Sequence, residues 1–398
     1  MNVEITAPAA RAATLPPARI RRIVAAPLAG ASPKGGWSEE IQPRDSVHTL
    51  IAVHTDAGVV GHGSVFTDGR LVEAGLKVLE PLFLGENALE PERVAEKLHQ
   101  NTFWMGRGGT LTHVISGIDI ALWDILGKMT GLSVGQLLGG RYRAKVRPYC
   151  SLLMDEPAVM AEELATFRER DGFRAFKIGW GPFGRRDSYA SDELIIRAAR
   201  EAIGPESKLF VDAGGSDAHW NANLKWATRT AEMLADYDVA WFEEALRPDA
   251  IEDFIALRHA SPVPIAGGEV LTRRQTFLPW LARGALDIVQ PDVTKVGGIS
   301  EQRRIAWMAD DFGVTYVGHG WNTALGVAAD LQMAAAFPKV DYVEFIGGSA
   351  YVDGILTEPF RLDADGYLEI PDRPGLGVEL DLDRIAAYAP NAAELGAG

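Results

Sequence analysis

Short apolar segments recur along the middle of the chain, and nearly every one ends in an ionisable residue. They are rich in Val, Ile and Phe, which is typical of buried strands. The segments read FRAFKIG, KLFVDAG, AWFEEAL, PIAGGE, DIVQPDVT, VTYVGHG and DYVEFIG, and their ionisable residues are Lys177, Asp212, Glu243, Glu269, Asp292, His319 and Glu344. Successive members of this set are 23 to 35 positions apart, which leaves room for one strand, one loop and one helix. The pattern predicts a βα-barrel.

The sequence between these strands has helical character. In GGISEQRRIAWMADDFG, Ser300 is a candidate N-cap, and Gly313 follows the predicted helix end. A further segment, VRPYCSLL from Val146, supplies a first strand and brings the predicted strands to eight. Because the carboxyl ends of barrel strands converge on one mouth, we expect the seven ionisable residues to form a single pocket.

The region before the barrel has other periods. RIVAAPLAG and HTLIAVHTDAGVVGHGSVF alternate β-branched and polar residues, which predicts antiparallel strands with a turn at Asp56, Ala57 and Gly58. From 71 to 140 the apolar spacing becomes three and four, most clearly in VISGIDIALWDILGKMTG, where Gly131 can end the helix. These patterns predict an α+β domain ahead of the barrel.

Four regions follow from the changes of pattern. Residues 1–17 are rich in Ala and Pro without a period, so we expect a disordered arm. The α+β domain is predicted over 18–145 and the barrel over 146–347. The turn-rich tail, 348–398, is expected to fold back onto the N-terminal domain, where it could help to close a lid over the mouth.

The composition is that of an ordinary globular protein, with 398 residues, 47% hydrophobic and 23% charged. The net charge of −15 would repel nucleic acid. No apolar run reaches the roughly 18 residues that span a bilayer, and the first twenty residues lack the apolar stretch of a signal peptide. The single cysteine, Cys150, leaves no intrachain disulfide, and its place in a strand predicts a buried thiol. We therefore expect a cytoplasmic protein without nucleic-acid or membrane partners.

Three of the strand-end residues suggest a metal site. Asp212, Glu243 and Glu269 end consecutive strands, so their carboxylates would lie side by side and repel one another unless a cation neutralised them. Ligands that are all oxygen suit Mg²⁺. The alternative, that each is a helix cap or a member of a salt bridge, holds more often for a single acidic residue than for three at successive strand ends.

The remaining strand-end residues suggest proton transfer. A carboxylate beside an imidazole, as predicted for Asp292 and His319, orients the ring and raises its basicity, giving a general acid or base. His219, in the loop after the third strand, is a rival, while the other six histidines are expected to be structural. Lys177 would face His319 across the barrel, and a nearby divalent metal would lower its pKa and make it a second base; the alternative is a surface lysine.

Substrate selectivity is expected to come from loops. Lys34 and Trp37 lie in a Gly- and Pro-rich segment that could form a lid, and Arg185 and Arg186 follow the second strand. The two arginines are either solvated, or one of them binds the distal carboxylate of a diacid substrate. Ala175 faces the same side as Lys177, so we expect it to open space beside the lysine.

At these residues the sequence resembles the enolase superfamily, and specifically its mandelate racemase subgroup. The matching stretches are FKIG, VDAG, WFEEAL, GGE, QPD-x-x-K-x-GG, the His of VGHG, VEF and, before the barrel, RGGTLTHVISGIDIALWDILGK. The resemblance covers nearly all of residues 20–380. It implies a (β/α)₇β TIM-like barrel, with a capping domain over it that is formed by the N-terminal region and the C-terminal tail.

The resemblance also implies roles for individual residues. Mg²⁺ would bind Asp212, Glu243 and Glu269, the His319–Asp292 dyad would lie on one face of the substrate, with Lys177 on the other, and Glu344 would hydrogen-bond the substrate carboxylate. Asp292 stands where muconate-cycloisomerase and dipeptide-epimerase relatives carry a catalytic lysine, whereas Lys295 matches a loop lysine that both groups often share.

Two positions depart from the family pattern. Ala175 replaces the first lysine of a frequent Lys-x-Lys, so the neighbouring ammonium that would depress the pKa of Lys177 is missing. Gly214 stands two residues after Asp212 in place of a frequent Asn, which removes a polar contact near the metal or the substrate.

The chemistry shared by such enzymes is removal of a proton α to a carboxylate. With a β-hydroxyl on the substrate the result is loss of water, so our first hypothesis is an Mg²⁺-dependent dehydratase of an aldonate or aldarate that gives a 2-keto-3-deoxy acid. The second is a racemase, epimerase or lactone cycloisomerase that uses the same enolate, and a remote third is a non-catalytic binder of sugar acids. We also expect a homo-oligomer, between a dimer and an octamer.

Overall fold

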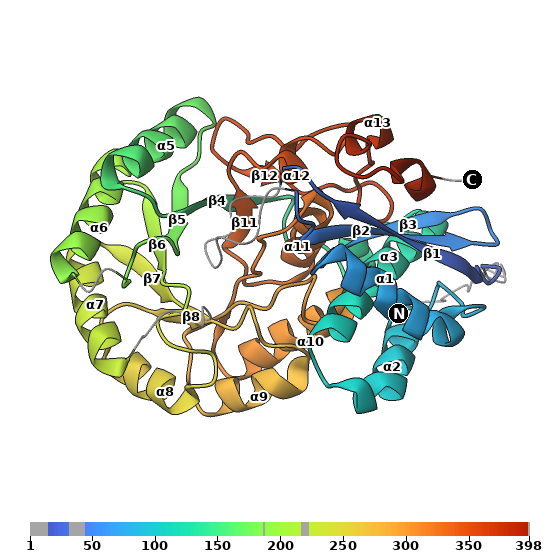
Figure 1. The fold of residues 1–398 in the computed structure, drawn as a ribbon, viewed down its shortest axis with the longest axis horizontal. Coiled ribbons are helices and arrows are strands. Elements are labelled where there is room, and N and C mark those ends of the chain that lie inside the picture. Colours follow the sequence, from blue (N-terminus) through green and yellow to red (C-terminus); the bar gives the residue numbers. More distant parts are fainter. Residues whose placement is uncertain (1–14, 32–43, 186–187, 216–222, 397–398) are drawn as a thin grey trace, which may run out of the picture.

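The computed structural model describes residues 15–31, 44–185, 188–215 and 223–396, and Figure 1 shows their arrangement. The chain forms a mixed α/β structure in which a ring of strands and outer helices lies beside a smaller α+β domain. This is the predicted TIM-like barrel with an N-terminal capping domain, so the fold class is confirmed.

The barrel contains eight strands that pair in parallel, in the order β10-β9-β8-β7-β6-β5-β4-β11. The strands are β4 (Lys145–Leu153), β5 (Ala175–Gly179), β6 (Lys208–Asp212), β7 (Val239–Glu243), β8 (Ile265–Gly267), β9 (Ile288–Val289), β10 (Thr315–Tyr316) and β11 (Tyr342–Ile346). Seven helices alternate with them: α5 (Pro157–Arg170), α6 (Tyr189–Ile203), α7 (Leu224–Asp236), α8 (Ile251–Ala260), α9 (Arg274–Ala282), α10 (Gly298–Asp311) and α11 (Ala324–Ala336). The alternation is that of a (β/α)₇β barrel.

A packed layer of side chains fills the barrel interior below the strand ends. Every strand contributes to it or, for β10, the residue that follows the strand: Tyr149, Ala175, Phe210, Trp241, Ala266, Ile288, Val317 and Tyr342. The Phe210 and Trp241 rings are stacked, with centroids 3.5 Å apart. This layer closes the interior of the barrel. The polar side chains that follow it towards the carboxyl ends of the strands therefore lie at the mouth.

The capping domain is a three-stranded antiparallel sheet covered by helices. Its strands are β1 (Ile20–Leu28), β2 (His48–Thr55) and β3 (Val60–Phe66), and its helices are α1 (Gly69–Phe83), α2 (Pro91–Thr102), η1 (Phe103–Met105), α3 (Thr110–Thr130) and α4 (Val134–Leu137). The apolar stripe of α3 packs into the core of this domain, with Val114, Ile118 and Leu122 fully buried. Gly131 ends α3 in the left-handed conformation, as predicted.

Helix α3 also contacts the start of barrel helix α10. Ser116 Oγ accepts a hydrogen bond from Gly297 N at 2.8 Å, and Asp119 Oδ2 accepts one from Ser300 N at 2.9 Å. Trp123 Nε1 donates to Ser300 Oγ at 3.0 Å. Helix α10 begins at Gly298, so Ser300 lies inside it. The prediction that Ser300 caps the helix is wrong. A carboxylate from another domain takes that role, which local sequence cannot reveal.

Gly298, the first residue of α10, lies against Asp119 of α3. Its φ is +81°, and a Cβ added there would lie 2.4 Å from Asp119 Oδ2. We expect Gly298→Ala to lower the free energy of unfolding by about 1–3 kcal/mol more than Gly313→Ala, because overpacking adds to the backbone strain. Gly313 is a matched control, since its φ is +70° and its added Cβ would meet nothing within 4 Å. Thermal unfolding of the two variants tests this, and equal midpoints would contradict it.

The C-terminal segment contacts both parts of the fold. It contains α12 (Ala350–Asp353), β12 (Leu368–Glu369), α13 (Leu382–Ile385) and η2 (Ala392–Leu395), and β12 pairs antiparallel with β4 of the barrel. At its end, the carbonyls of Glu394 and Leu395 lie 3.0 and 2.9 Å from Nε2 of His54 and His62 in the capping sheet. The tail thus joins the barrel to the capping sheet.

Three smaller expectations concern the rest of the chain. Among the described residues, none of the helices has the length and apolar character needed to cross a membrane. Cys150 is fully buried on β4, and burial raises the pKa of its thiol well above the ordinary value. The predicted arm, 1–17, lies mostly outside the described residues, which begin at Leu15.

Candidate active site

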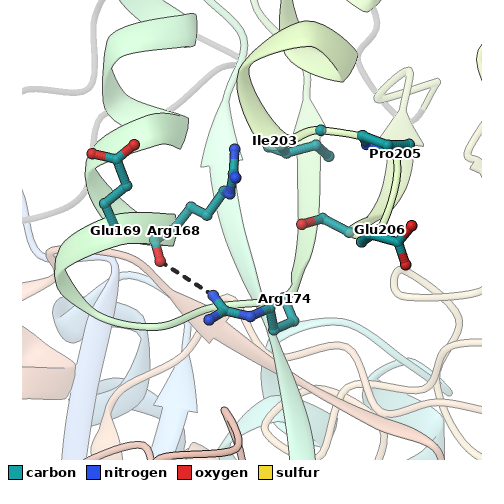
Figure 2. Close-up of a pocket in the computed structure, with 8 residues that line it drawn as sticks. Arg168, Glu169, Arg174, Ile203, Pro205 and Glu206 are labelled. Carbon is teal, nitrogen blue, oxygen red and sulfur yellow. Dashed lines mark hydrogen bonds between the residues drawn. The ribbon is translucent and has the colours of Figure 1, made fainter.

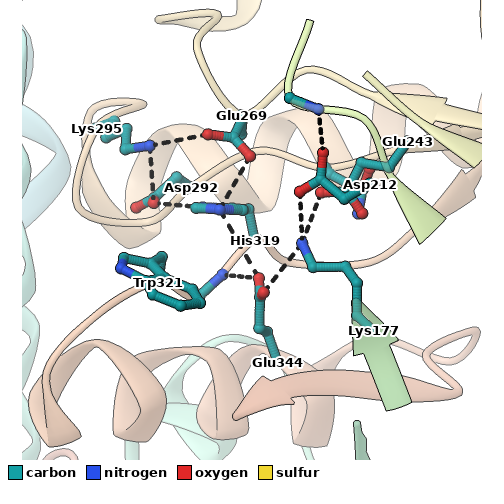
Figure 3. Close-up of polar contacts among 12 residues, drawn as sticks. Lys177, Asp212, Glu243, Glu269, Asp292, Lys295, His319, Trp321 and Glu344 are labelled. Atoms are coloured by element: carbon teal, nitrogen blue, oxygen red, sulfur yellow. Dashed lines mark hydrogen bonds and ion pairs between the residues drawn. The ribbon is translucent and has the colours of Figure 1, made fainter. Parts of the chain in front are cut away.

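All seven predicted strand-end residues lie together at the carboxyl ends of the barrel strands, and they are buried (Figure 3). Lys177, Asp212, Glu243 and Glu344 belong to β5, β6, β7 and β11, while Glu269, Asp292 and His319 lie two or three residues after the ends of β8, β9 and β10. Residues spread over the sequence thus become neighbours because parallel strands end at the same rim.

The three carboxylates predicted to bind metal form one cluster. Asp212, Glu243 and Glu269 each offer a carboxylate oxygen, and these oxygens lie within 4.8 Å of one another. Burial, and then the charge of Glu243, raise the pKa of Asp212 to about 8. Burial is the main cause, and repulsion between the neighbouring carboxylates adds to it.

Lys177 lies beside two of these carboxylates and beside Glu344. Its Nζ lies 2.7 Å from Glu243 Oε1, 3.0 Å from Glu344 Oε1 and 3.4 Å from Asp212 Oδ2. Burial alone would lower the pKa of Lys177, but the charges of Glu243 and Glu344 outweigh burial and hold the pKa well above the ordinary value. These contacts favour the ammonium form of Lys177, which cannot accept a proton.

The predicted dyad has hydrogen-bonding geometry. His319 Nδ1 lies 2.7 Å from Asp292 Oδ2, and His319 Nε2 lies 3.0 Å from Glu269 Oε2. Burial would lower the pKa of His319, but the carboxylates of Glu269 and Glu344 hold it well above the ordinary value. Carboxylates at both ring nitrogens favour the imidazolium form of His319, which could donate a proton from Nε2.

Glu344 lies between the two cationic groups. Its Oε2 accepts a hydrogen bond from Gly320 N at 2.6 Å and lies 3.9 Å from His319 Nε2. Burial would raise the pKa of Glu344, but Lys177 and His319 outweigh burial and lower it. An ionised Glu344 only accepts hydrogen bonds, so the contact with a substrate carboxylate that the family resemblance implies requires a protonated Glu344.

Lys295, on the loop after β9, completes the charged set. Its Nζ lies 3.4 Å from Glu269 Oε1 and 3.6 Å from Asp292 Oδ2, and it lies over the ring of Phe66 of the capping domain, 4.5 Å from the centroid. Burial alone would lower the pKa of Lys295, but the charge of Glu269 and then that of Asp292 raise it. Burial would raise the pKa of Asp292, but Lys295 and His319 outweigh burial and lower it, so Lys295 favours the ionised form of Asp292.

The charge balance of the set fits a divalent cation. The seven strand-end residues and Lys295 include five carboxylates, against two ammonium groups and one imidazole. With His319 protonated and all five carboxylates ionised, as metal binding requires of the triad, two negative charges are in excess in a buried space, and buried charge without compensation is unfavourable. A divalent cation among Asp212, Glu243 and Glu269 would balance it, and an oxygen-only donor set is the kind that hard cations prefer.

Sequence reasoning missed the neutral side chains that hold these carboxylates. Thr294 N and Oγ1 donate to Asp292 Oδ1 at 2.7 and 2.6 Å, and Asn322 Nδ2 lies 3.4 Å from the same oxygen. Trp241 and Gln290 both donate to Glu243. The latter pair had a signal in the sequence, because each residue lies two positions before a strand-end acid and so shares its face.

Several predicted substrate-binding residues cannot be placed. Lys34, Trp37, Arg186 and His219 lie outside the described residues. Arg185 is described: its Nη1 donates to Gly181 O at 2.7 Å, and its guanidinium carbon lies 5.8 Å from the centroid of the Trp180 ring. Contact of Arg185 with a substrate carboxylate stays a prediction.

The space expected beside Lys177 is filled. Ala175 is fully buried in the barrel-interior layer, where the Tyr149 ring lies 5.4 Å from both Phe210 and Trp241. The prediction that Ala175 opens space beside Lys177 is therefore wrong. Ala175 is the first residue of β5, two positions before Lys177, and it belongs to the same packed layer as the rings of Tyr149, Phe210 and Trp241.

The second departure from the family pattern also has a steric explanation. Gly214 has φ +64°, and a Cβ added there would lie 2.6 Å from a ring carbon of Trp180. Its N donates to Asp212 Oδ1 at 2.8 Å. The glycine therefore lets an indole ring approach the backbone beside Asp212.

A hollow at the opposite end of the barrel lacks this chemistry (Figure 2). Arg168 Nη1 donates to Ala202 O at 2.9 Å, and Arg174 Nη1 donates to Arg168 O at 3.3 Å. Both arginines connect backbone segments near the amino ends of β5 and β6, where barrels carry stabilising contacts. The mouth in Figure 3 is therefore the candidate active site.

Two family descriptions match the chain. "Mandelate racemase / muconate lactonizing enzyme, N-terminal domain" matches residues 43–139, and "Enolase C-terminal domain-like" matches residues 159–384. Together they cover most of the capping domain, without β1, and most of the barrel with part of the tail.

Individual proteins are similar over most of their length. The chain is 34% identical over 354 residues to D-galactarolactone cycloisomerase of Agrobacterium fabrum, covering 86% of this chain and 91% of the relative. It is also 34% identical over 354 residues to D-xylonate dehydratase of Haloferax volcanii, covering 85% and 84%. The crystal structure of an enolase from Bradyrhizobium complexed with magnesium and mandelic acid has a TM-score of 0.81 at 28% identity, covering 94% of this chain and 99% of that one. The chain therefore belongs to the enolase superfamily, in the family of mandelate racemase and muconate lactonizing enzyme.

Proposed function

We propose that the protein is an Mg²⁺-dependent enzyme that removes the proton α to the carboxylate of an aldonate or aldarate and eliminates water, giving a 2-keto-3-deoxy acid. The observation that carries this proposal is the meeting of a buried carboxylate triad with two proton-transfer groups in one pocket. Two relatives at 34% identity support it, since they are named for action on D-xylonate and on D-galactarolactone.

Asp212, Glu243 and Glu269 would hold the cation. Bound there, Mg²⁺ would stabilise the negative charge that develops on the substrate carboxylate and would offset the carboxylate charges that keep Lys177 and His319 protonated. Magnesium is the ion present in the Bradyrhizobium structure, which supports the choice of metal.

Lys177 and His319 would move the protons. Their nitrogen atoms lie on either side of Glu344, at 3.0 Å from Oε1 and 3.9 Å from Oε2. Elimination of water needs one group that accepts the α proton and one that donates a proton to the departing hydroxide. The pair supplies both, and Asp292 fixes the imidazole so that Nε2 faces the pocket.

The product assay tests this proposal. The wild-type enzyme with Mg²⁺ is expected to form a 2-keto acid from at least one member of a panel of aldonates and aldarates, as measured by semicarbazone absorbance. Exchange of the α proton for deuterium without net product would instead indicate a racemase or epimerase. Binding without either reaction would contradict catalysis altogether.

A lactone cycloisomerase is the second candidate, because the A. fabrum relative bears that name at the same 34% identity as the dehydratase. Both reactions would use the same proton-transfer groups. Including sugar lactones in the panel separates them: loss of the lactone with formation of an open-chain keto acid would favour the cycloisomerase.

A further inference from the structure

Glu243 is held by two neutral N–H donors on the oxygen that faces away from Lys177. Trp241 Nε1 lies 3.0 Å and Gln290 Nε2 lies 2.7 Å from Glu243 Oε2, while Oε1 lies 2.7 Å from Lys177 Nζ. We propose that Trp241 and Gln290 are positioning residues of the metal site, which fix Oε2 and thereby direct Oε1 towards the cation. This inference rests on the proposed Mg²⁺ site.

Aromatic packing restricts the orientation of the Trp241 indole. Trp241 lies two positions before Glu243 on β7, so both side chains point into the barrel. Its ring is stacked on Phe210, with an interplanar angle of 5° and centroids 3.5 Å apart, and Tyr149 contacts it edge-on at 5.4 Å. Because Phe210 and Tyr149 confine the ring, its N–H is directed at Glu243.

Gln290 makes a contact that stability alone does not explain. Its side chain is fully buried, Nε2 donates to Glu243, and Oε1 has no hydrogen-bond partner among the described residues. A buried carbonyl without a hydrogen-bond partner is unfavourable, because it loses its contacts with water. The Gln290 amide therefore costs stability at this position. Its contact with Glu243 is the interaction that accounts for it.

The two donors act on the same oxygen from different strands. Trp241 belongs to β7 and Gln290 follows β9, so together they fix the carboxylate in two directions. Hydrogen bonds of this kind orient metal-binding carboxylates, and their loss typically lowers metal affinity by about 10–100-fold. Removing either N–H should therefore weaken the cation site without removing a ligand.

Calorimetric titration of metal-stripped, full-length protein with Mg²⁺ tests the proposal. Trp241→Phe and Gln290→Met keep much of the buried volume but lose the N–H, and each is expected to raise the Kd for Mg²⁺ by about 10–100-fold. Activity assays should show the same weakening of Mg²⁺ binding. The variants should need more Mg²⁺ for half-maximal rate, while their kcat at saturating Mg²⁺ should return to within a few-fold of wild type. A damaged fold would lower kcat at every Mg²⁺ concentration.

Matched controls use the same substitutions away from the site. Trp280→Phe alters a buried tryptophan on α9 that contacts Phe254, and Gln332→Met removes a buried amide that donates to Pro371 O and Leu376 O. Both should bind Mg²⁺ within about twofold of wild type.

The other outcomes overturn either the positioning role of Trp241 and Gln290 or the proposed function. If wild type binds Mg²⁺ and the Trp241 and Gln290 variants bind it equally tightly, the positioning role is overturned while the proposed function stands. The same holds if the controls weaken binding as much as the site variants do. If wild type binds no Mg²⁺, the proposed function itself is overturned, and the positioning role falls with it.

Discussion

Removing the divalent metal is expected to abolish activity, and Mg²⁺ is expected to restore it. Without a cation, Asp212 has its pKa raised to about 8 and Lys177 is held protonated by Glu243 and Glu344, so the pocket lacks both a charge stabiliser and a free base. A cation that stabilises developing charge contributes several kcal/mol, which corresponds to a rate loss of at least about 10³-fold when it is absent.

The substitution Glu243→Gln tests the same metal site by removing one of its ligands. The amide removes one negative charge from the triad, so the variant should stay inactive at Mg²⁺ concentrations that saturate wild type. Glu301→Gln is the matched control, because Glu301 is also buried and forms ion pairs with Arg274 and Arg304, away from the pocket. Full activity of wild type after EDTA treatment, in metal-free buffer, would show that the metal assignment is wrong.

Replacing His319 by asparagine is expected to lower kcat by about 10²–10⁴-fold, the usual contribution of a general acid or base. Asparagine can still hydrogen-bond Asp292, but it has no nitrogen that titrates, so the loss should appear in kcat with little change in thermal stability. The measurement is the rate of 2-keto acid formation at saturating Mg²⁺ and substrate.

His62→Asn is the control for His319→Asn. His62 is a histidine of the capping sheet whose Nε2 lies 2.9 Å from Leu395 O, and it does not belong to the strand-end set. We expect this variant to keep wild-type kcat. A His319→Asn enzyme within a few-fold of wild type would refute the dyad and direct attention to His219.

The sequence predicted the barrel and the membership of the pocket because both depend on local pattern. One strand, loop and helix per period fixes where each strand ends, and the ends of parallel strands meet whatever the loops do. This is why Lys177 and Glu344, 167 positions apart in the numbering, are found with nitrogen and oxygen 3.0 Å apart. The sequence pattern predicted the topology, and the topology determined which residues meet in the site.

The incorrect predictions concern contacts between distant segments. Ser300 looked like a helix cap because its own neighbours permit that, but Asp119 from the capping domain binds its N–H. Ala175 looked like a gap in the pocket wall, but Phe210 and Trp241 from the next strands fill the layer around it. In both cases a residue from another element decides the outcome, and spacing along the chain does not encode that element's position.

The charge states in the pocket are the other feature that sequence could not supply. The spacing of Lys177 and Glu243 predicts that both face the mouth, but not that Nζ lies 2.7 Å from Oε1 and keeps its proton. A pKa depends on burial and on distances of a few ångströms, which only coordinates provide.

The most direct test of the central claim follows the α proton itself. Proton NMR in D₂O, with a panel of aldonates, aldarates and their lactones, reports whether the C2 hydrogen of a substrate is removed. The account predicts that with Mg²⁺ the wild-type enzyme removes this hydrogen from at least one substrate, with water loss or deuterium exchange, and that Glu243→Gln does not. Turnover of a substrate that keeps its C2 hydrogen, or equal activity of Glu243→Gln, would contradict it.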